Sequence, residues 1–218
     1  MMPGHCVAHF NRMQNYETCA LRNTDHRTDL ENAALLLAEC ESISAVVYGC
    51  TSGELLHGRE LIVEVLQEIM PNAAVVTPLA ASIEAMRARR IDNVSILSPY
   101  LDDLNRRIIE LFGQHGITVE TVVSPQNWRH TSLSKIDAQD LKTVAESMEF
   151  QHSQGLFIPC NALAIVGAIR DLEGCTSVPV FTSTQVSVWK ALKHENLLGE
   201  QSLHRFGSIF SNLEITRQ

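Results

Sequence analysis

The sequence predicts an α/β fold with two similar lobes, each built on a parallel sheet. Two observations lead to this prediction. From residue 28 onward, short β-branched runs alternate with helix-period stretches, an order typical of parallel sheets that carry helices on both faces. In addition, residues 46–53 are echoed by residues 156–163, so the chain contains an internal repeat. We therefore expect two pseudo-symmetric Rossmann-like (flavodoxin-like) lobes.

Local signals define the elements of the first half. Thr28 and Glu31 have capping-box spacing ahead of an apolar helix. Runs rich in valine and isoleucine predict strands. Thr77 before Pro78 predicts the start of a helix, because threonine favours the cap and proline the first turn. In chain order these elements are a helix over 28–40, a strand over 43–48, a helix over 52–70, a strand over 73–76 and a helix from 78.

The same signals continue through the second half. Gly116 can end a helix in the left-handed conformation, and the polar stretch before Ser134 predicts a loop. The elements are a strand over 94–98, a helix over 101–114, a strand over 117–123, a helix over 137–152, a strand over 155–159, a helix over 161–172, a strand over 178–182 and a helix over 185–194. We assign residues 1–92 together with 183–218 to lobe 1 and residues 93–182 to lobe 2.

The repeat places one cysteine in each lobe. Residues 46–53 read VVYGCTSG and residues 156–163 read LFIPCNAL. Each run is followed by a strand that ends in threonine before a helix, at Thr77 and Thr182. Because ligands of such folds bind beyond the carboxyl ends of the strands, we expect Cys50 and Cys160 to face one cleft between the lobes.

A thiol at the start of a helix has favourable surroundings for chemistry. The helix dipole and the free N–H groups favour the thiolate and lower the thiol pKa. The same N–H groups, with the hydroxyls of Thr51 and Ser52, can hold a carboxylate. The alternative is structural: cysteine often packs as a small apolar residue, and residues 51–54 also fit a plain capping box. The other cysteines lack this context and are expected to be free structural thiols, at positions 6, 19, 40 and 175.

Composition excludes several classes of function. The chain has 17 Lys+Arg against 25 Asp+Glu and no extended basic patch, which argues against nucleic acid. Its uncharged apolar runs are shorter than the roughly 20 residues that cross a bilayer. The first residues do not resemble a signal peptide, so we expect a cytoplasmic protein. Although His5, Cys6 and His9 suggest a metal, Cys6 would point away from both histidines in a strand, so we expect no metal site.

Several motifs carry a family resemblance. In order they are YGCTSG at 48–53, TPLAA at 77–81, LSPY at 97–100, FIPCNAL at 157–163 and TQVSVW at 184–189. With these motifs the chain resembles the aspartate/glutamate racemase superfamily, in the branch that contains maleate cis–trans isomerase and arylmalonate decarboxylase. The resemblance implies a cofactor-independent isomerase or racemase acting on a small carboxylic or dicarboxylic acid, with the active site between the lobes.

The resemblance also assigns residues. Cys50 and Cys160 match the catalytic cysteines; Thr51, Ser52, Tyr100 and the backbone N–H of Asn161 would hold a substrate carboxylate. A substrate-binding loop position falls on His130, with Asn127 as the other candidate. The decarboxylase of the branch keeps only the second cysteine, so the presence of both favours isomerisation or racemisation. A decarboxylase-like enzyme remains an alternative.

The beginning of the chain departs from the family pattern. Relatives start with an extra strand, whereas residues 5–13 already match the strand that normally comes second. We therefore expect either a coding segment upstream of Met1 or a diverged, non-catalytic relative that binds a carboxylate or a protein partner. A sheet edge left open in this way favours pairing into a homo-oligomer.

Overall fold

The computed structural model describes residues 1–13, 25–40, 42–128 and 132–211. The helices are α1 (His26–Ala38), α2 (Thr51–His57), α3 (Arg59–Ile69), α4 (Pro78–Ala88), α5 (Asp102–Gln114), α6 (Ala138–Glu146), α7 (Ile169–Thr176) and α8 (Ser183–His194). The strands are β1 (Ala45–Val47), β2 (Ala74–Val76), β3 (Asn93–Leu97), β4 (Thr118–Val123), β5 (Gly155–Ile158) and β6 (Val180–Thr182). Short 3₁₀ turns are η1 (Gln126–Trp128), η2 (Leu133–Lys135), η3 (Val166–Ala168), η4 (Gln201–Phe206) and η5 (Ser208–Phe210).

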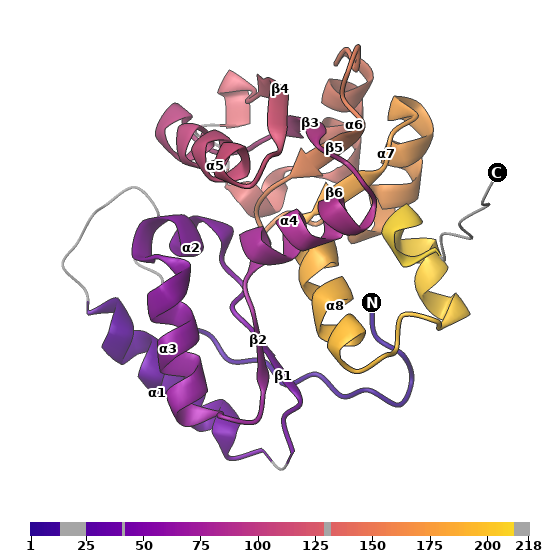
Figure 1. Cartoon of the computed structure of the whole chain (residues 1–218). Helices are drawn as coiled ribbons and strands as arrows, with labels where there is room; N and C mark the ends of the chain where they lie inside the picture. The colour runs from indigo at the N-terminus through magenta and orange to yellow at the C-terminus, as the bar shows by residue number, and fades with distance from the viewer. Residues whose placement is uncertain (14–24, 41, 129–131, 212–218) are drawn as a thin grey trace.

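The strands form two separate parallel sheets, as the alternation of elements predicts. One sheet pairs β1 with β2, and the other has the order β4-β3-β5-β6. Figure 1 shows the larger sheet with α5, α6 and α7 in the upper lobe and the smaller sheet with α1 and α3 in the lower one. The predicted α/β fold with two lobes is confirmed.

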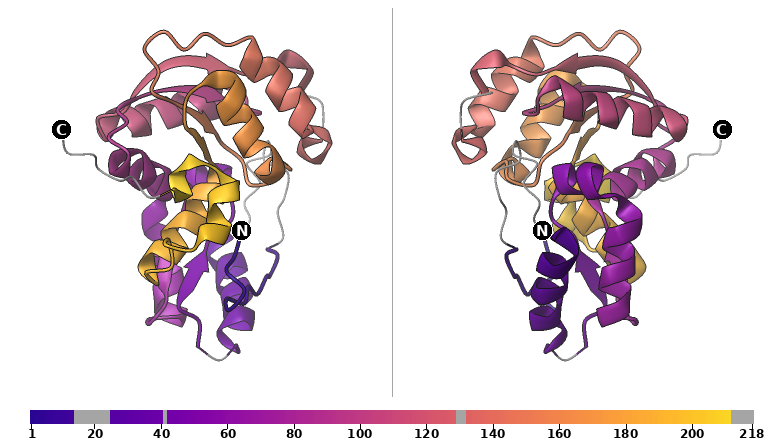
Figure 2. Two further views of the ribbon diagram at one scale, coloured as in Figure 1. Left: turned by 90° about the vertical axis from the view of Figure 1, so that its right-hand side faces the viewer. Right: turned by 90° about the vertical axis from the view of Figure 1, so that its left-hand side faces the viewer.

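Helices α4 and α8 connect the two sheets. Each follows a strand that ends in a buried threonine, Thr77 after β2 and Thr182 after β6, as the repeat predicts. The two helices pack against each other, and α8 contacts β1 and β2 as well as β6. Figure 2 shows α8 and the turns after it beside the smaller sheet. The exact boundaries at residues 92 and 182 stay a prediction.

The apolar core is divided in the same way. A large cluster surrounds β3, β5 and β6 and includes residues of α4 and α8. A smaller, separate cluster joins α1, β1 and α3, with Leu30, Val46, Tyr48 and Ile62 among its buried members. Each sheet therefore has its own apolar support.

Four predicted elements differ from the structure. The helix over 52–70 is broken at Gly58, whose φ of 84° ends α2 and starts α3. Asp25 rather than Thr28 caps α1. The segment that begins at Asn161 turns first, and its α-helix starts only at Ile169. The helix over 137–152 ends at Glu146.

Residues 5–13, matched in sequence to a strand, form none. Val7 and Phe10 are 77% and 91% exposed, so this segment lacks the pairing partner and the apolar cover that a strand needs. Within the described residues, β1 pairs only with β2 and leaves its other edge open. No helix in the described part of the chain is long and apolar enough to span a membrane.

Candidate active site

Cys50 lies between β1 and α2 and caps the helix with its own sulfur. The backbone N–H of Gly53 donates to Sγ at 3.3 Å, and the Ser52 hydroxyl lies 3.5 Å from the same sulfur. The capping box expected from residues 51–54 is therefore wrong, because the cap is one residue earlier. The thiol is half-buried at a helix N-terminus, in the position that the sequence predicts for it.

A capping box would have used Glu54 at the start of α2. Instead, Glu54 accepts hydrogen bonds at the start of α4. Its buried carboxylate accepts from the hydroxyl of Thr77 at 2.6 Å and from the N–H of Leu79 at 2.7 Å. Burial raises the pKa of Glu54, and these hydrogen bonds oppose the rise. The Glu54 side chain of α2 thus accepts hydrogen bonds at the N-terminus of α4, and these bonds hold the two helices together.

Cys160 follows β5 in an unusual backbone conformation. Its φ is 89°, in the left-handed region that residues other than glycine rarely adopt. Hydrogen bonding from the N–H groups of Ala162 and Leu163 and from the Tyr100 hydroxyl lowers the pKa of this thiol. The side chain is only 7% exposed, so burial raises the pKa of Cys160 despite these hydrogen bonds. The prediction of a lowered pKa is wrong here, because a buried turn replaces the helix start.

Tyr100 connects the two cysteine segments. Its buried hydroxyl lies near the sulfur of Cys160 and the side chain of Thr51, and both affect its pKa. Burial, followed by the charges of Cys160 and Cys50, raises the pKa of Tyr100 well above its ordinary value. The hydroxyl is therefore not exposed to solvent. The hydroxyl is a neutral donor at the junction of the two segments.

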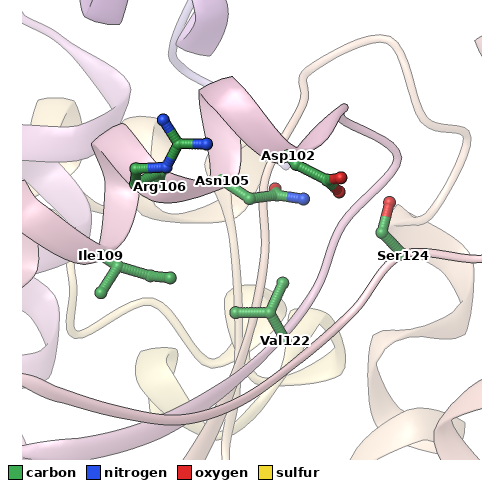
Figure 3. Close-up of a pocket in the computed structure, with 6 residues that line it drawn as sticks. All are labelled: Asp102, Asn105, Arg106, Ile109, Val122 and Ser124. Carbon is green, nitrogen blue, oxygen red and sulfur yellow. The ribbon is translucent and has the colours of Figure 1, made fainter.

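Hydrogen bonds to three neighbouring side chains hold the backbone of Tyr100. Its carbonyl accepts from the Asn105 amide at 3.1 Å and from the Ser124 hydroxyl at 2.7 Å, and its N–H donates to Ser98. Figure 3 shows Asn105 on α5 and Ser124 after β4, on the wall of a hollow of about 370 Å³. These contacts fix the direction of the tyrosine side chain.

Further contacts join the strand ends of the two sheets. The Thr51 hydroxyl donates to the Ser183 hydroxyl at 2.8 Å, and both residues are buried. A Cβ at Gly49 would lie 3.7 Å from Nδ2 of Asn161, so this amide reaches the segment that carries Cys50. Asn161 Oδ1 is buried and has no partner among the described groups. The predicted residues of both lobes thus meet at one place, with Ser52 beside the Cys50 sulfur.

The sequence gives two candidates for a substrate-binding loop position. His130 lies outside the described residues. Asn127 is exposed on η1, whereas Trp128 next to it is 4% exposed and belongs to the large core cluster. The tryptophan is therefore a packing residue.

Sequence reasoning missed a group of three residues around Tyr48, two positions before Cys50. The hydroxyl of Tyr48 lies 3.2 Å from Nε2 of His26, and the rings of His26 and His57 stack at 3.6 Å. Nothing in their spacing predicts this contact, because α1, β1 and α2 bring the three together only in the folded chain.

The two cysteines lie apart from two hollows on the surface. The second hollow, of about 850 Å³, lies among α2, α4 and α5 and is lined by Glu54, Arg59 and Arg107 among others. Neither hollow is lined by Cys50 or Cys160 in the described part of the chain. In that same part, no three His, Cys, Asp or Glu side chains are grouped to hold a metal ion. The chemistry available around the two cysteines is that of two thiols, backbone N–H groups and the hydroxyls of Thr51, Ser52, Tyr100 and Ser183.

Comparison with known proteins agrees with this arrangement. Arylmalonate decarboxylase of Bordetella bronchiseptica is 22% identical over 125 residues, which are 54% of this chain and 50% of that protein. This chain therefore matches about half the length of that curated relative. A maleate isomerase variant from Pseudomonas putida, solved with maleate, superposes with a TM-score of 0.74 at 19% identity, covering 85% of this chain and 76% of that one.

A second solved structure is a Nocardia farcinica maleate cis–trans isomerase variant with a covalently bound succinylcysteine intermediate. It gives a TM-score of 0.75 at 16% identity, covering 84% of this chain and 77% of that one. The superfamily branch inferred from the motifs is confirmed. Since residues 25–204 match the family model described as arylmalonate decarboxylase, the chain belongs to the arylmalonate decarboxylase family.

Proposed function

We propose that this protein is a cofactor-independent isomerase or racemase of a small carboxylic or dicarboxylic acid, with Cys50 and Cys160 as its reacting groups. One observation carries the proposal. The Tyr100 hydroxyl lies near the sulfur of Cys160 and the side chain of Thr51, the residue that follows Cys50. This supports a site that uses two thiols, one from the segment after each sheet's strand, near one tyrosine hydroxyl.

Binding of the substrate carboxylate is assigned to the groups around the thiols. Thr51, Ser52 and Tyr100 supply hydroxyl donors, and the N–H of Asn161 follows Cys160 directly. Preorganised donors of this kind stabilise a developing oxyanion without metal. The alkylated cysteine of the Nocardia farcinica enzyme supports a covalent role for a cysteine in this fold.

Two reaction types fit paired thiols. In cis–trans isomerisation, the Cys50 thiolate bonds to one alkene carbon and the π electrons move toward the carboxylate. The central bond rotates, and the S–C bond breaks as the alkene re-forms. In racemisation, one sulfur takes the α-proton and the other returns a proton to the opposite face. Neither reaction changes the oxidation state of the substrate.

Turnover of a small panel of acids tests the proposal. Maleate, aspartate, glutamate and arylmalonates are incubated in deuterium oxide and followed by proton NMR, which detects isomerisation, α-proton exchange and decarboxylation. We expect Cys50→Ala and Cys160→Ala to abolish turnover of the active substrate, while Cys175→Ala, on α7, leaves it unchanged. Full activity of either of the first two variants refutes the assignment. Binding without any turnover indicates a non-catalytic carboxylate-binding relative.

A decarboxylase is the second candidate, because the matching family model bears that description. This reaction needs one proton donor at the face from which carbon dioxide leaves. It therefore predicts release of carbon dioxide from an arylmalonate that survives loss of Cys50 but not of Cys160. The presence of both thiols favours the isomerase or racemase.

We also propose that copies of the chain pair through the open edge of β1. Val47 on this strand is 40% exposed, and an edge with free backbone groups favours association. Light scattering after gel filtration measures the mass, and a monomer at micromolar concentration contradicts the proposal.

A further inference from the structure

Two histidine rings join the end of α2 to the start of α1. His57 is the last residue of α2 and His26 is the first residue of α1. Their rings are parallel, with 3.6 Å between the ring centroids and 3° between the ring planes. The rest of α2 is held elsewhere, because Glu54 accepts from the hydroxyl of Thr77 at the start of α4.

Helix α1 is held on the opposite side by α3. Arg27 donates to Glu64 and Glu68 of α3 at 2.8 Å each, and to Glu31 of its own helix at 2.9 Å. The two helices also pack against each other. Gly58, with a φ of 84°, separates α2 from α3. The histidine stack therefore connects two groups of helices, α1 with α3 and α2 with α4, whose backbone link is this glycine.

The stack suits neutral rings and opposes two charged ones. Burial, followed by the charge of His57, lowers the pKa of His26, and Asp29 raises it. Burial also lowers the pKa of His57. The dipole favours a positive ring at the end of α2 and disfavours one at the start of α1, so the first proton goes to His57. The Tyr48 hydroxyl, 3.2 Å from Nε2 of His26, donates or accepts according to the tautomer and so permits either state.

The other charged groups near the stack leave Asp29 as the carboxylate that acts on it among the described residues. Asp25 accepts from groups of its own turn, and Glu54 accepts from groups of α4. Arg59 begins α3, and Arg107 of α5 donates to a backbone carbonyl of α2 at 3.2 Å. Both cations disfavour a further positive charge at this end of α2.

We propose that the stacked rings of His26 and His57 are an acid-sensitive switch, closed while at least one ring is neutral and open when both are protonated. Two positive rings at this distance repel each other, and opening at Gly58 separates them and returns them to water. Tyr48, two positions before Cys50, then loses its contact with His26. The switch goes beyond the proposed function and needs no substrate.

Amide hydrogen exchange of the full-length protein tests the switch. Exchange is measured by mass spectrometry at about pH 7.5 and about pH 5.5, and each rate is divided by the intrinsic rate at that pH. Below 6.5, the ordinary histidine pKa, an open form with both rings in water binds more protons than the closed form. We therefore expect peptides 26–32 and 53–60 to lose protection on acidification, while peptide 169–176 of α7 keeps its own.

Three variants separate the switch from simple packing. His57→Gln removes one of the two charges and should abolish most of the acid-induced loss. Asp29→Asn should have the opposite effect and deepen the loss, because it removes the carboxylate that favours protonated His26. The matched control is His115→Gln, an exposed histidine after α5, which should keep the loss of the parent protein. A purely structural stack would instead lower protection equally at both pH values.

Two results would overturn the switch. One is a parent protein whose peptides 26–32 and 53–60 keep their protection at the lower pH. The other is an acid-induced loss of the same size in His57→Gln as in the parent. If His57→Gln does not fold, proton NMR titration of the parent decides: interacting rings titrate below 6.5 in two separate steps, and two rings that titrate together at the ordinary value refute the switch. None of these results bears on turnover, so the proposed function is tested separately.

Discussion

The hydroxyl of Thr51 donates to the hydroxyl of Ser183 across 2.8 Å, although the two residues are 132 positions apart in the chain. Thr51 opens α2 and Ser183 opens α8, so the bond joins the starts of two helices that follow different sheets. Both residues are buried, 1% and 0% exposed. The bond therefore helps to fix the distance between the two cysteine segments.

Replacing Thr51 by valine tests this bond. Valine keeps the shape but removes the hydroxyl that donates to Ser183. We expect the free energy of unfolding to fall by about 1–2 kcal/mol, as for other lost buried hydrogen bonds, and turnover to fall with it. Urea denaturation measures the first effect. Thr51→Ser keeps the hydroxyl and should retain most of the stability; equal losses in both variants would contradict the hydrogen-bond explanation.

Tyr100→Phe removes the donor to the Cys160 sulfur. This hydrogen bond lowers the pKa of Cys160, against the larger effect of burial, so its loss should raise the pKa further. The pH at which Cys160 alkylation is half-maximal should rise accordingly. Turnover should fall about 100-fold, the usual effect of losing one preorganised donor. An unaltered Cys160 profile in the folded variant would show that the hydroxyl has no influence on the thiol.

Gly53→Ala should destabilise the protein. An added Cβ meets the Tyr48 hydroxyl and comes within 3.2 Å of the Cys50 sulfur, and both neighbours are held by packing. We expect a loss of about 1–3 kcal/mol in thermal unfolding, typical of overpacked sites. Gly174→Ala is the matched control in α7, where a Cβ meets nothing within 4 Å. That change should stabilise the helix by about 0.5–1 kcal/mol.

Glu54 should make stability depend on pH. Because burial raises the pKa of this carboxyl in the folded chain above its ordinary value of 4.5, the folded state holds the proton more tightly. The free energy of unfolding should therefore fall as pH rises from about that value through the raised pKa, and level off above it. Glu54→Gln, which cannot ionise, should lack this fall. The difference between the two proteins in urea titrations measures it, with exposed Glu60→Gln as control; a constant difference across this range would disprove the assignment.

The order of the elements could be predicted, because alternation depends on local periodicity. The repeat also located Cys50, Cys160, Thr77 and Thr182 at the ends of strands, where the structure has them. The break at Gly58 could not be seen, because a single glycine inside a helical pattern is tolerated and its φ of 84° is visible only in the folded chain.

The parts of the site that depend on tertiary contacts could not be predicted from the sequence. Glu54 has the right spacing for a local capping box, yet its carboxylate bonds Thr77, 23 residues away. The turn at Cys160 replaces the helix that periodicity predicted from Asn161, and burial there reverses the expected direction of the thiol pKa. His26 and Tyr48 meet only because α1 packs on the small sheet.

The division of the apolar core has a consequence for heat inactivation. The smaller cluster supports Cys50 and the preceding strand β1, which is paired on one side only among the described residues, while Cys160 belongs to the larger cluster. The weaker lobe should open first on warming, as local unfolding follows the extent of packing. Catalysis would then cease at a temperature where most of the molecule is still native, and cooling from that point would restore it.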